Sequence, residues 1–333
     1  MSDSSGRFVL VTGGAGYIGS HAAKALAARG FVPVTYDNLI HGHRWAVQSG
    51  PFVEGDIGDR AKLLETISRY NISAVMHFAA FAYVGESIQR PERYFNNNVT
   101  KSLTLLDALV DSGVRHVVFS SSCATYGTPD RMPIAEDTPQ RPVNPYGETK
   151  LIMERALHWY AGAHDLTFAA LRYFNAAGAD PDGKLGEVHS PETHLIPLVL
   201  NAIDGRGALE IYGGDYPTPD GTCVRDYIHV ADLADAHVRA LDYLLSGGAS
   251  VAMNLGTGNG HSVREVIGVA EHVAGRKVPH RIVPRRVGDP PILVADPSSA
   301  ARVLAWRPQY SDLDCIIRSA WKWHSEYSKV RPV

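Results

Sequence analysis

The chain has 333 residues, 45% of them hydrophobic and 20% charged, which is ordinary for globular proteins and allows a sizeable core. The 32 basic and 35 acidic residues leave a net charge of −3, so the basic surface typical of nucleic-acid-binding proteins is not expected. No apolar stretch is long enough to cross a membrane, and the polar start MSDSSGR lacks the layout of a secretory signal. We therefore expect a cytoplasmic protein with no nucleic-acid or membrane partner. Three scattered cysteines predict neither disulfides nor a metal site.

Short apolar runs alternate with amphipathic stretches in the first half of the chain, which is typical of βαβ units on a parallel sheet. Two of the runs, AVMHF and HVVFS, are continuously apolar, as expected for strands covered on both faces. The pattern predicts an α/β protein with a Rossmann-type doubly wound parallel sheet. The predicted strands are Phe8–Thr12, Val32–Tyr36, Phe52–Glu54, Ala74–Phe78, His116–Ser120 and Phe168–Phe174.

The composition changes after Asn175, where clusters of Gly, Pro and Asp such as AAGADPDGKLG predict a smaller, loop-rich α/β lobe. A short strand at Tyr227–Val230 and an amphipathic helix at Ala231–Ser246 indicate that the chain returns to the first domain before leaving it again. We predict one domain over residues 1–175 and 227–250, and a second over 176–226 and 251–333.

The segment VLVTGGAGYIGS places Gly13, Gly16 and Gly19 three apart, after a predicted strand and before the helical stretch HAAKALAARG. Glycines in this context let the backbone approach a pyrophosphate, which the helix N-terminus attracts. Asp37 ends the second strand, where a carboxylate accepts hydrogen bonds from an adenosine ribose and repels a 2′-phosphate. The pattern predicts NAD rather than NADP, with Asp56 and Ile57 as candidate adenine contacts.

Tyr146 and Lys150 stand four apart in PYGETK and share one face of a predicted helix. A tyrosine with a pKa near ~10 acts as a base near neutral pH only if that pKa falls by about three units, roughly 4 kcal/mol. The Lys150 ammonium and an oxidised nicotinamide both favour the phenolate. Ser122, at the end of the fifth predicted strand, can relay a hydrogen bond to a substrate oxygen. These three residues form the predicted catalytic triad.

Several motifs carry a resemblance to a known family: TGGAGYIGSH, HFAA followed by VGES, FSSSCATYG, NPYGETK, LRYFNAAGA and DGTCVRDYIHVADLADAH. From Arg7 to about Trp323 the sequence resembles the extended short-chain dehydrogenase/reductases, and within them the UDP-galactose 4-epimerases. The resemblance implies an isomerase that interconverts UDP-galactose and UDP-glucose through a 4-keto intermediate. It also implies that the first domain binds NAD and the second the UDP-sugar.

The resemblance further implies a set of contacts for each ligand. The expected NAD-binding residues are Gly13, Gly16, Tyr17, Ile18, Gly19, Asp37, Asn38, Asp56, Ile57, Phe78, Ala79, Ala80, Asn97, Tyr146, Lys150 and Tyr173. The expected substrate-binding residues are Ser122, Tyr146, Asn175, His194, Leu195, Tyr212, Arg225, Arg286, Asp289 and Leu293. A homodimer joined through helices near Tyr94–Ser112 and Gly147–Ala163, with an exposed apolar face, is also implied.

Three positions depart from the family pattern. His194 stands where many members have an Asn that helps to bind the diphosphate, and Ala82 where a Lys is common near the cofactor. Leu293 stands at the position that gates the sugar pocket, which is Tyr in some members and smaller in others. The choice between UDP-galactose, an N-acetylated UDP-hexose and a UDP-pentose such as UDP-xylose or UDP-arabinose therefore stays open.

Two other functions fit the same fold. A nucleotide-sugar 4,6-dehydratase needs an Asp-Glu pair after the catalytic Ser or Thr, whereas Cys123 and Ala124 follow Ser122, so elimination is disfavoured. Cys123 could be a nucleophile, but a buried structural thiol is the preferred interpretation. A non-catalytic NAD-binding regulator is disfavoured because it needs no Tyr146 and Lys150 together.

Overall fold

The chain divides into two compact units. The computed structural model describes residues 7–286 and 288–330. The first unit comprises the chain up to Gly127 together with Gln140–Arg172 and Ala234–Met253, and the second unit the remainder. The segment 1–6, part of the polar start MSDSSGR, lies outside the described residues.

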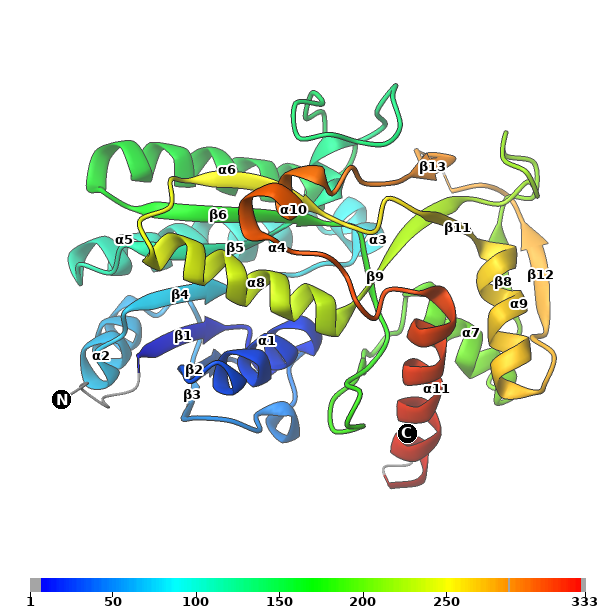
Figure 1. Cartoon of the computed structure of the whole chain (residues 1–333), viewed down its shortest axis with the longest axis horizontal. Helices are drawn as coiled ribbons and strands as arrows, with labels where there is room; N and C mark the ends of the chain where they lie inside the picture. Colours follow the sequence, from blue (N-terminus) through cyan, green and yellow to red (C-terminus); the bar gives the residue numbers. More distant parts are fainter. Residues whose placement is uncertain (1–6, 287, 331–333) are drawn as a thin grey trace. The chain divides into compact units, whose positions relative to one another are not determined.

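The first unit is built on a seven-stranded sheet with the strand order β10-β6-β5-β4-β1-β2-β3 (Figure 1). β1 pairs in parallel with both β2 and β4, β2 pairs in parallel with β3, and β4 with β5. The six predicted strands are present with small differences at their ends, and the predicted α/β fold is confirmed. The strands are β1 Phe8–Thr12, β2 Val32–Asp37, β3 Phe52–Glu54, β4 Ala74–His77, β5 His116–Ser122, β6 Thr167–Tyr173 and β10 Val251–Leu255.

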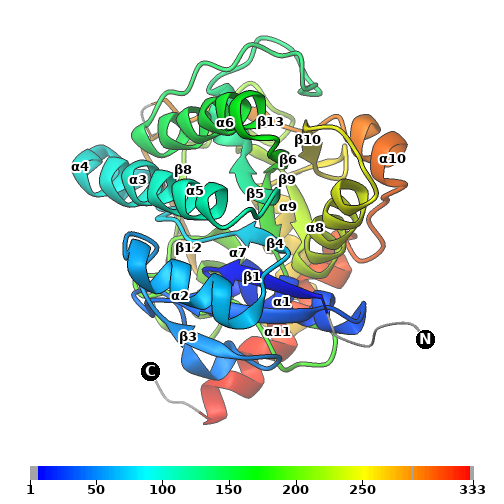
Figure 2. The ribbon, with the colours of Figure 1, turned by 90° about the vertical axis from the view of Figure 1, so that its left-hand side faces the viewer.

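Helices cover both faces of this sheet (Figure 2). α2, α5 and α6 lie on one face and bury a core with Leu10, Val34, Val75 and Val117, whereas α1 and α8 lie on the other face. The long helices are α1 Tyr17–Ala28, α2 Arg60–Tyr70, α5 Lys101–Asp111, α6 Pro145–His164 and α8 Val230–Leu245. Shorter elements are η1 Arg44–Ala46, α3 Val84–Gln89, α4 Pro91–Tyr94, the π-helix η2 Phe95–Thr100 and the 3₁₀-helix η3 Cys123–Tyr126.

The order of strands reverses at β1, which lies between β2 and β4. Open parallel sheets bind ligands outside the carboxyl ends of the strands at such a switch point, because the connecting helices leave in opposite directions there. The glycine loop follows β1 directly, and the predicted serine is the last residue of β5. The topology therefore places these motifs at the binding edge of the sheet.

The second unit has β9 as its central strand, which pairs with β11 in antiparallel fashion and with β7 and β13 in parallel. β8 and β12 form a separate parallel pair, and α7, α9 and α11 pack around a core that includes Val199, Ile211, Val266 and Ile316. The strands are β7 Asn175–Ala177, β8 Leu209–Tyr212, β9 Val224–His229, β11 Gly260–Ser262, β12 His280–Val283 and β13 Ile292–Leu293. The helices are α7 Leu195–Ile203, α9 Val263–Ala274, α10 Ser298–Leu304 and α11 Leu313–Val330. Across the described part of the chain, every helix is too short or too polar to traverse a bilayer.

Candidate active site

The glycine loop approaches neighbouring backbone so closely that side chains have no room. Gly13 has φ +72°, and a Cβ there would lie 2.6 Å from the backbone nitrogen of Ala79. A Cβ on Gly19 would lie 2.2 Å from the Gly13 carbonyl oxygen. α1 begins at Tyr17 with Gly16 as its N-cap, and no side chain caps it. The N–H groups of this first turn can therefore bind an anion.

Asp37 ends β2 beside this loop and is almost completely buried. One carboxylate oxygen accepts a hydrogen bond from the Ala15 N–H at 3.0 Å, and the other accepts one from the Leu39 N–H at 2.8 Å. Burial raises the pKa of this carboxyl, and the two N–H donors partly offset that effect. Because a carboxylate has about four acceptor positions, Asp37 can still accept hydrogen bonds from a diol.

Asp56 is held by several donors at the neighbouring strand end. Lys101 Nζ lies 2.7 Å and Asn38 Nδ2 3.0 Å from the same carboxylate oxygen. Burial alone would raise the pKa of Asp56, but hydrogen bonds from Lys101, Gly58 and Asn38 lower it. The side chain of Ile57 belongs to the hydrophobic core. Lys101, which sequence reasoning missed, thus supplies the positive charge that pairs with Asp56.

The predicted cofactor segment from Phe78 to Ala80 follows β4 and is half-buried. The segment is anchored at Phe81, whose N–H donates to Asn98 Oδ1 at 2.8 Å and whose carbonyl accepts from Asn98 Nδ2 at 2.9 Å. Asn98 Nδ2 also lies 3.2 Å from Thr149 Oγ1 on α6. Asn98 belongs to the π-helix η2 next to the predicted Asn97, and π-helical turns are frequent at functional sites. Sequence reasoning missed Asn98, which ties this segment to α6.

The helix α6, which carries Tyr146 and Lys150, begins at Pro145. Asn144 caps it by accepting the Gly147 N–H at 2.9 Å, and Pro145 occupies the first turn. A Cβ on Gly147 would lie 2.4 Å from the Ala124 carbonyl oxygen, so only glycine allows α6 to approach the turn after Ser122 this closely. This contact sets the Ser122 end of β5 against the first turn of α6.

Tyr146 and Lys150 are both buried, and Lys150 is only 3% exposed. Lys150 Nζ donates to the Ser120 carbonyl oxygen at 2.7 Å and lies 5.8 Å from the centre of the Tyr146 ring. Burial lowers the pKa of Lys150 to about 7, although Glu154 one turn away acts to raise it. Ser122 Oγ accepts the Ala124 N–H at 3.1 Å, which leaves its hydrogen available to another acceptor.

A buried ionic network is centred on Glu154, one helical turn after Lys150. Arg172 on β6 donates to both carboxylate oxygens of Glu154 on α6, with a closest N–O distance of 2.6 Å. Arg172 also donates to the Tyr126 hydroxyl at 2.8 Å, and Ser121 donates to Glu154. Sequence reasoning missed this network, because its members are separated by many residues along the chain.

In the second unit the predicted substrate residues form two clusters. Arg225 on β9 forms an ion pair with Asp289, and Leu293 on β13 is the strand partner of Arg225. Separately, the Arg286 guanidinium stacks 3.8 Å from the centre of the Tyr212 ring. An arginine over an aromatic ring is a suitable platform for a flat base or a phosphate.

The remaining predicted positions are more dispersed. Tyr173 ends β6 and is half-buried, and Asn175 begins β7 as the strand partner of Tyr227. His194 is the N-cap residue of α7, ahead of Leu195. The Glu187 carboxylate contacts the His194 imidazole and, against the effect of burial, raises its pKa above the ordinary value. His194 can therefore supply positive charge to an anion.

Two further side chains, Cys123 and Ala82, are partly or fully exposed. Cys123 is half-buried rather than buried, because it begins the 3₁₀-helix after β5 instead of lying inside the strand. The expected buried thiol at this position was therefore wrong. Ala82 is exposed, at the end of the segment that Asn98 anchors.

Comparison with known proteins decides the family. Residues 9–256 match the model of the NAD dependent epimerase/dehydratase family. The chain belongs to this family. The UDP-glucose 4-epimerase of Rhizobium leguminosarum bv. trifolii is 54% identical to this epimerase/dehydratase over 96% of the chain and 98% of the relative. That of Lacticaseibacillus casei is 50% identical over 96% of the chain and 97% of the relative.

Solved structures agree with this membership. The UDP-glucose 4-epimerase of Brucella ovis in complex with NAD superposes on this epimerase/dehydratase with a TM-score of 0.93 and 57% identity, covering 95% of this chain and 97% of that one. The enzyme of Bifidobacterium longum in complex with NAD⁺ and UDP gives a TM-score of 0.92 at 38% identity, covering 96% of this chain and 98% of that one. The expected resemblance to UDP-galactose 4-epimerases is confirmed.

The residues of this epimerase/dehydratase fit the cofactor of its family. The pyrophosphate of NAD would bind at the first turn of α1, which no side chain caps. Gly13 and Gly19, where a Cβ would clash with backbone, form the loop beside it. Asp37 would accept the ribose hydroxyls, and its buried carboxylate would exclude the 2′-phosphate of NADP. The expected cofactor, NAD, is therefore consistent with the geometry of the loop.

Proposed function

We propose that this chain is an NAD-dependent UDP-glucose 4-epimerase, an isomerase that interconverts UDP-galactose and UDP-glucose through a 4-keto sugar. The observation that carries the proposal is the buried pair of Tyr146 and Lys150 on α6, set against the Ser122 end of β5. The names of relatives about 50% identical over nearly the whole chain support the same substrate.

In this proposal Tyr146 takes the proton of the sugar 4-hydroxyl and later returns it. The buried Lys150 ammonium favours the phenolate form of Tyr146, since opposite charges stabilise each other strongly where water is excluded. The Ser122 hydroxyl passes a hydrogen bond between the sugar oxygen and the phenol. NAD, when bound, supplies a reversible acceptor for the hydride of C4, so the reaction involves no net oxidation.

The 4-keto sugar must turn over between the two hydride transfers, so the enzyme has to hold the nucleotide while the sugar moves. We assign NAD binding to the first unit and UDP binding to the second. Arg225, Arg286 and His194 supply positive charge for the diphosphate, Tyr212 a stacking surface for uracil, and Asp289 an acceptor for the ribose. Asn175 and Leu195 complete this set, with Leu293 at the sugar.

The alternative functions have less support. In a 4,6-dehydratase a carboxylate would follow Ser122, whereas Cys123 and Ala124 occupy η3. A regulator without activity would gain nothing from a buried lysine beside Tyr146. The preference among UDP-hexoses, N-acetylated UDP-hexoses and UDP-pentoses stays open.

We further propose a cytoplasmic homodimer joined through α6 and the helical segment 94–112, where Trp159 and Phe95 are exposed.

A single assay separates these functions. Purified protein is incubated with UDP-galactose without added NAD, and UDP-glucose is measured over time. We expect conversion by the parent protein and at least a ~100-fold lower rate for Tyr146→Phe. A 4-keto-6-deoxy product would indicate a dehydratase, and no product would indicate a regulator. Near-normal turnover by Tyr146→Phe would contradict the assigned role of the phenol. A panel of UDP-sugars with the same preparation then ranks the substrates.

A further inference from the structure

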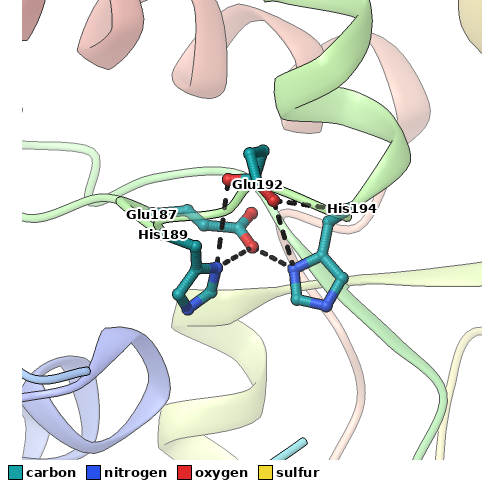
Figure 3. Close-up of side chains that lie close together, drawn as sticks. All are labelled: Glu187, His189, Glu192 and His194. Atoms are coloured by element: carbon teal, nitrogen blue, oxygen red, sulfur yellow. Dashed lines mark hydrogen bonds and ion pairs between the residues drawn. The ribbon is translucent and has the colours of Figure 1, made fainter. Parts of the chain in front are cut away.

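Four metal-ligating side chains gather in one loop of the second unit, in the sequence EVHSPETH that precedes α7. Glu187, His189, Glu192 and His194 each offer one ligand atom, and these atoms all lie within 4.8 Å of one another. Figure 3 shows the Glu187 carboxylate between the two imidazoles, with Glu192 facing both of them. The loop therefore presents two nitrogen and two oxygen ligands to one point.

The ligands form a small, preorganised cluster. His189 Nδ1 lies 3.1 Å from Glu187 Oε1 and 3.9 Å from Glu192 Oε2, and His194 Nδ1 lies 3.9 Å from Glu192 Oε1. The side chains of Glu187, His189 and Glu192 are only 7%, 15% and 13% exposed, whereas His194 is 45% exposed. Three of the proposed ligands are thus already largely shielded from water. The more exposed His194 marks the side from which an ion could enter from solvent.

The loop is held by its own backbone and by a contact with α11. The backbone N–H groups of Thr193 and His194 donate to Glu192 Oε1 at 2.8 and 2.9 Å. Trp323 Nε1 on α11 donates to the Glu187 carbonyl oxygen at 3.3 Å, and a Cβ on Gly186 would lie 2.3 Å from the Trp323 ring. Outer hydrogen bonds of this kind orient the ligands of metal sites.

The charges of the cluster favour a cation. Within residues 7–286 and 288–330, the ion pairs of Glu187 and Glu192 are made with imidazoles and not with Lys or Arg. Two carboxylates that share a largely buried position repel each other unless a positive charge lies between them. A divalent ion would displace the proton of His194, and with two neutral imidazoles and two carboxylates the group would then be electrically neutral.

We propose that Glu187, His189, Glu192 and His194 form a binding site for a divalent transition-metal ion of the Zn²⁺ type. Imidazole and carboxylate are ligands that Zn²⁺ accepts in tetrahedral sites. Metal–ligand bonds of about 2.0–2.2 Å place tetrahedral ligand atoms about 3.3 Å apart. The two His–Glu192 pairs at 3.9 Å would therefore have to close slightly, and the His194–Glu187 pair would have to open. The scattered cysteines had predicted no metal site; the pattern Glu-x-His-x-x-Glu-x-His was the missed signal.

This proposal does not depend on the epimerase function. A metal-bound His194 is neutral, so in the metal-loaded protein the positive charge for the diphosphate would come from Arg225 and Arg286. Its test uses the full chain with its cofactor, freed of metal by a chelator and titrated with Zn²⁺ by isothermal calorimetry. We expect about one tight Zn²⁺ per chain, and at least a ~100-fold weaker affinity in Glu187→Gln and in Glu192→Gln. His272→Gln removes an exposed imidazole on α9 of the same unit and should leave the affinity unchanged.

A second measurement avoids any ambiguity from misfolding. Co²⁺ bound in a tetrahedral nitrogen and oxygen site gives strong visible absorption, which should appear in the parent and in His272→Gln and be lost in His189→Gln. Circular dichroism checks that each variant is folded, and Glu192→Gln keeps the shape of the side chain. If the parent binds Zn²⁺ no more tightly than Glu192→Gln, the cluster is only a set of ion pairs. Equal weakening by His272→Gln would also overturn the proposal.

Discussion

Lys150 and Glu154 lie one turn apart on α6, and both side chains are buried. The Lys150 ammonium donates a hydrogen bond to the Ser120 carbonyl oxygen, while the Glu154 carboxylate accepts hydrogen bonds from two nitrogens of Arg172. Glu154 therefore stands at the junction between the proposed catalytic lysine and a structural ion pair. Its negative charge acts on Lys150 without any contact to the reacting atoms.

The first prediction concerns the pH profile of Glu154→Gln. Burial lowers the pKa of Lys150 to about 7, and Glu154 acts against this shift, so removing the carboxylate should lower that pKa further. If activity needs protonated Lys150, the alkaline limb of kcat/KM should move to lower pH. Arg155→Gln, an exposed charge change on the same helix, should not move it. If the alkaline limb of kcat/KM does not move in Glu154→Gln, this role of Glu154 is contradicted.

Glu154→Gln should also lower the free energy of unfolding by about 3–5 kcal/mol, because the buried Arg172 guanidinium loses the carboxylate with which it pairs.

The second prediction concerns acid stability and His77. Its ring nitrogens lie 2.7 Å from Thr12 Oγ1 and 2.9 Å from Ser102 Oγ, and burial, with Lys150 contributing, lowers its pKa to about 3. The unfolded chain takes up a proton near pH 6.5 and the folded chain only near 3, so stability from this group is lost as pH falls across that window. His77→Gln should flatten the fall in unfolding free energy between neutral pH and about pH 4. Urea unfolding tests this, with the exposed His158→Gln as control.

The third prediction concerns cofactor choice. Asp37→Asn replaces the carboxylate that the Ala15 and Leu39 N–H groups hold toward the glycine loop. Since a hydrogen bond to a charged group contributes roughly 1.5–3 kcal/mol, we expect ~10–100-fold weaker NAD binding. The preference for NAD over NADP should decrease at the same time. Fluorescence titration of both dinucleotides measures this, and Asp111→Asn, which removes an exposed carboxylate, should behave like the parent. Undiminished NAD affinity would remove Asp37 from the site.

The fourth prediction separates nucleotide anchoring from chemistry. The Arg286 guanidinium stacks on the Tyr212 ring, and a lysine ammonium cannot reproduce a planar stack. Arg286→Lys should raise KM for the UDP-sugar about tenfold with little change in kcat, because an anchor binds ground state and transition state alike. Arg281→Lys changes an exposed arginine on β12 and serves as the control. A fall in kcat at constant KM would instead place Arg286 at the reacting sugar.

The fifth prediction concerns assembly. Trp159 on α6 is 75% exposed, which is unusual for so large an apolar side chain on a free surface. If α6 forms the proposed dimer interface, Trp159→Glu should shift the protein toward monomers in light scattering after gel filtration. Ile282→Glu, at an exposed apolar side chain of the second unit, should leave the mass unchanged. A monomeric parent protein would refute the interface directly.

The sequence by itself determined the features that depend on local chemistry. Strand runs, the glycines before α1, Asp37 at a strand end, and the Tyr146–Lys150 spacing are each readable within a few residues, because backbone conformation and helix periodicity are short-range properties. The predicted strands and the α/β class were confirmed for this reason. The predicted ligand contacts in the second unit came from family resemblance and remain proposals.

Only the tertiary structure decided which distant side chains meet. Glu154 and Arg172, Asn98 and Thr149, and Arg286 and Tyr212 are 18, 51 and 74 residues apart, so no local pattern pairs them. These side chains meet because of the way the strands and helices pack. Packing also determines how deeply each side chain is buried, and burial lowers the pKa of Lys150. Sequence gives the chemical groups, whereas folding sets the distances and the desolvation through which those groups act.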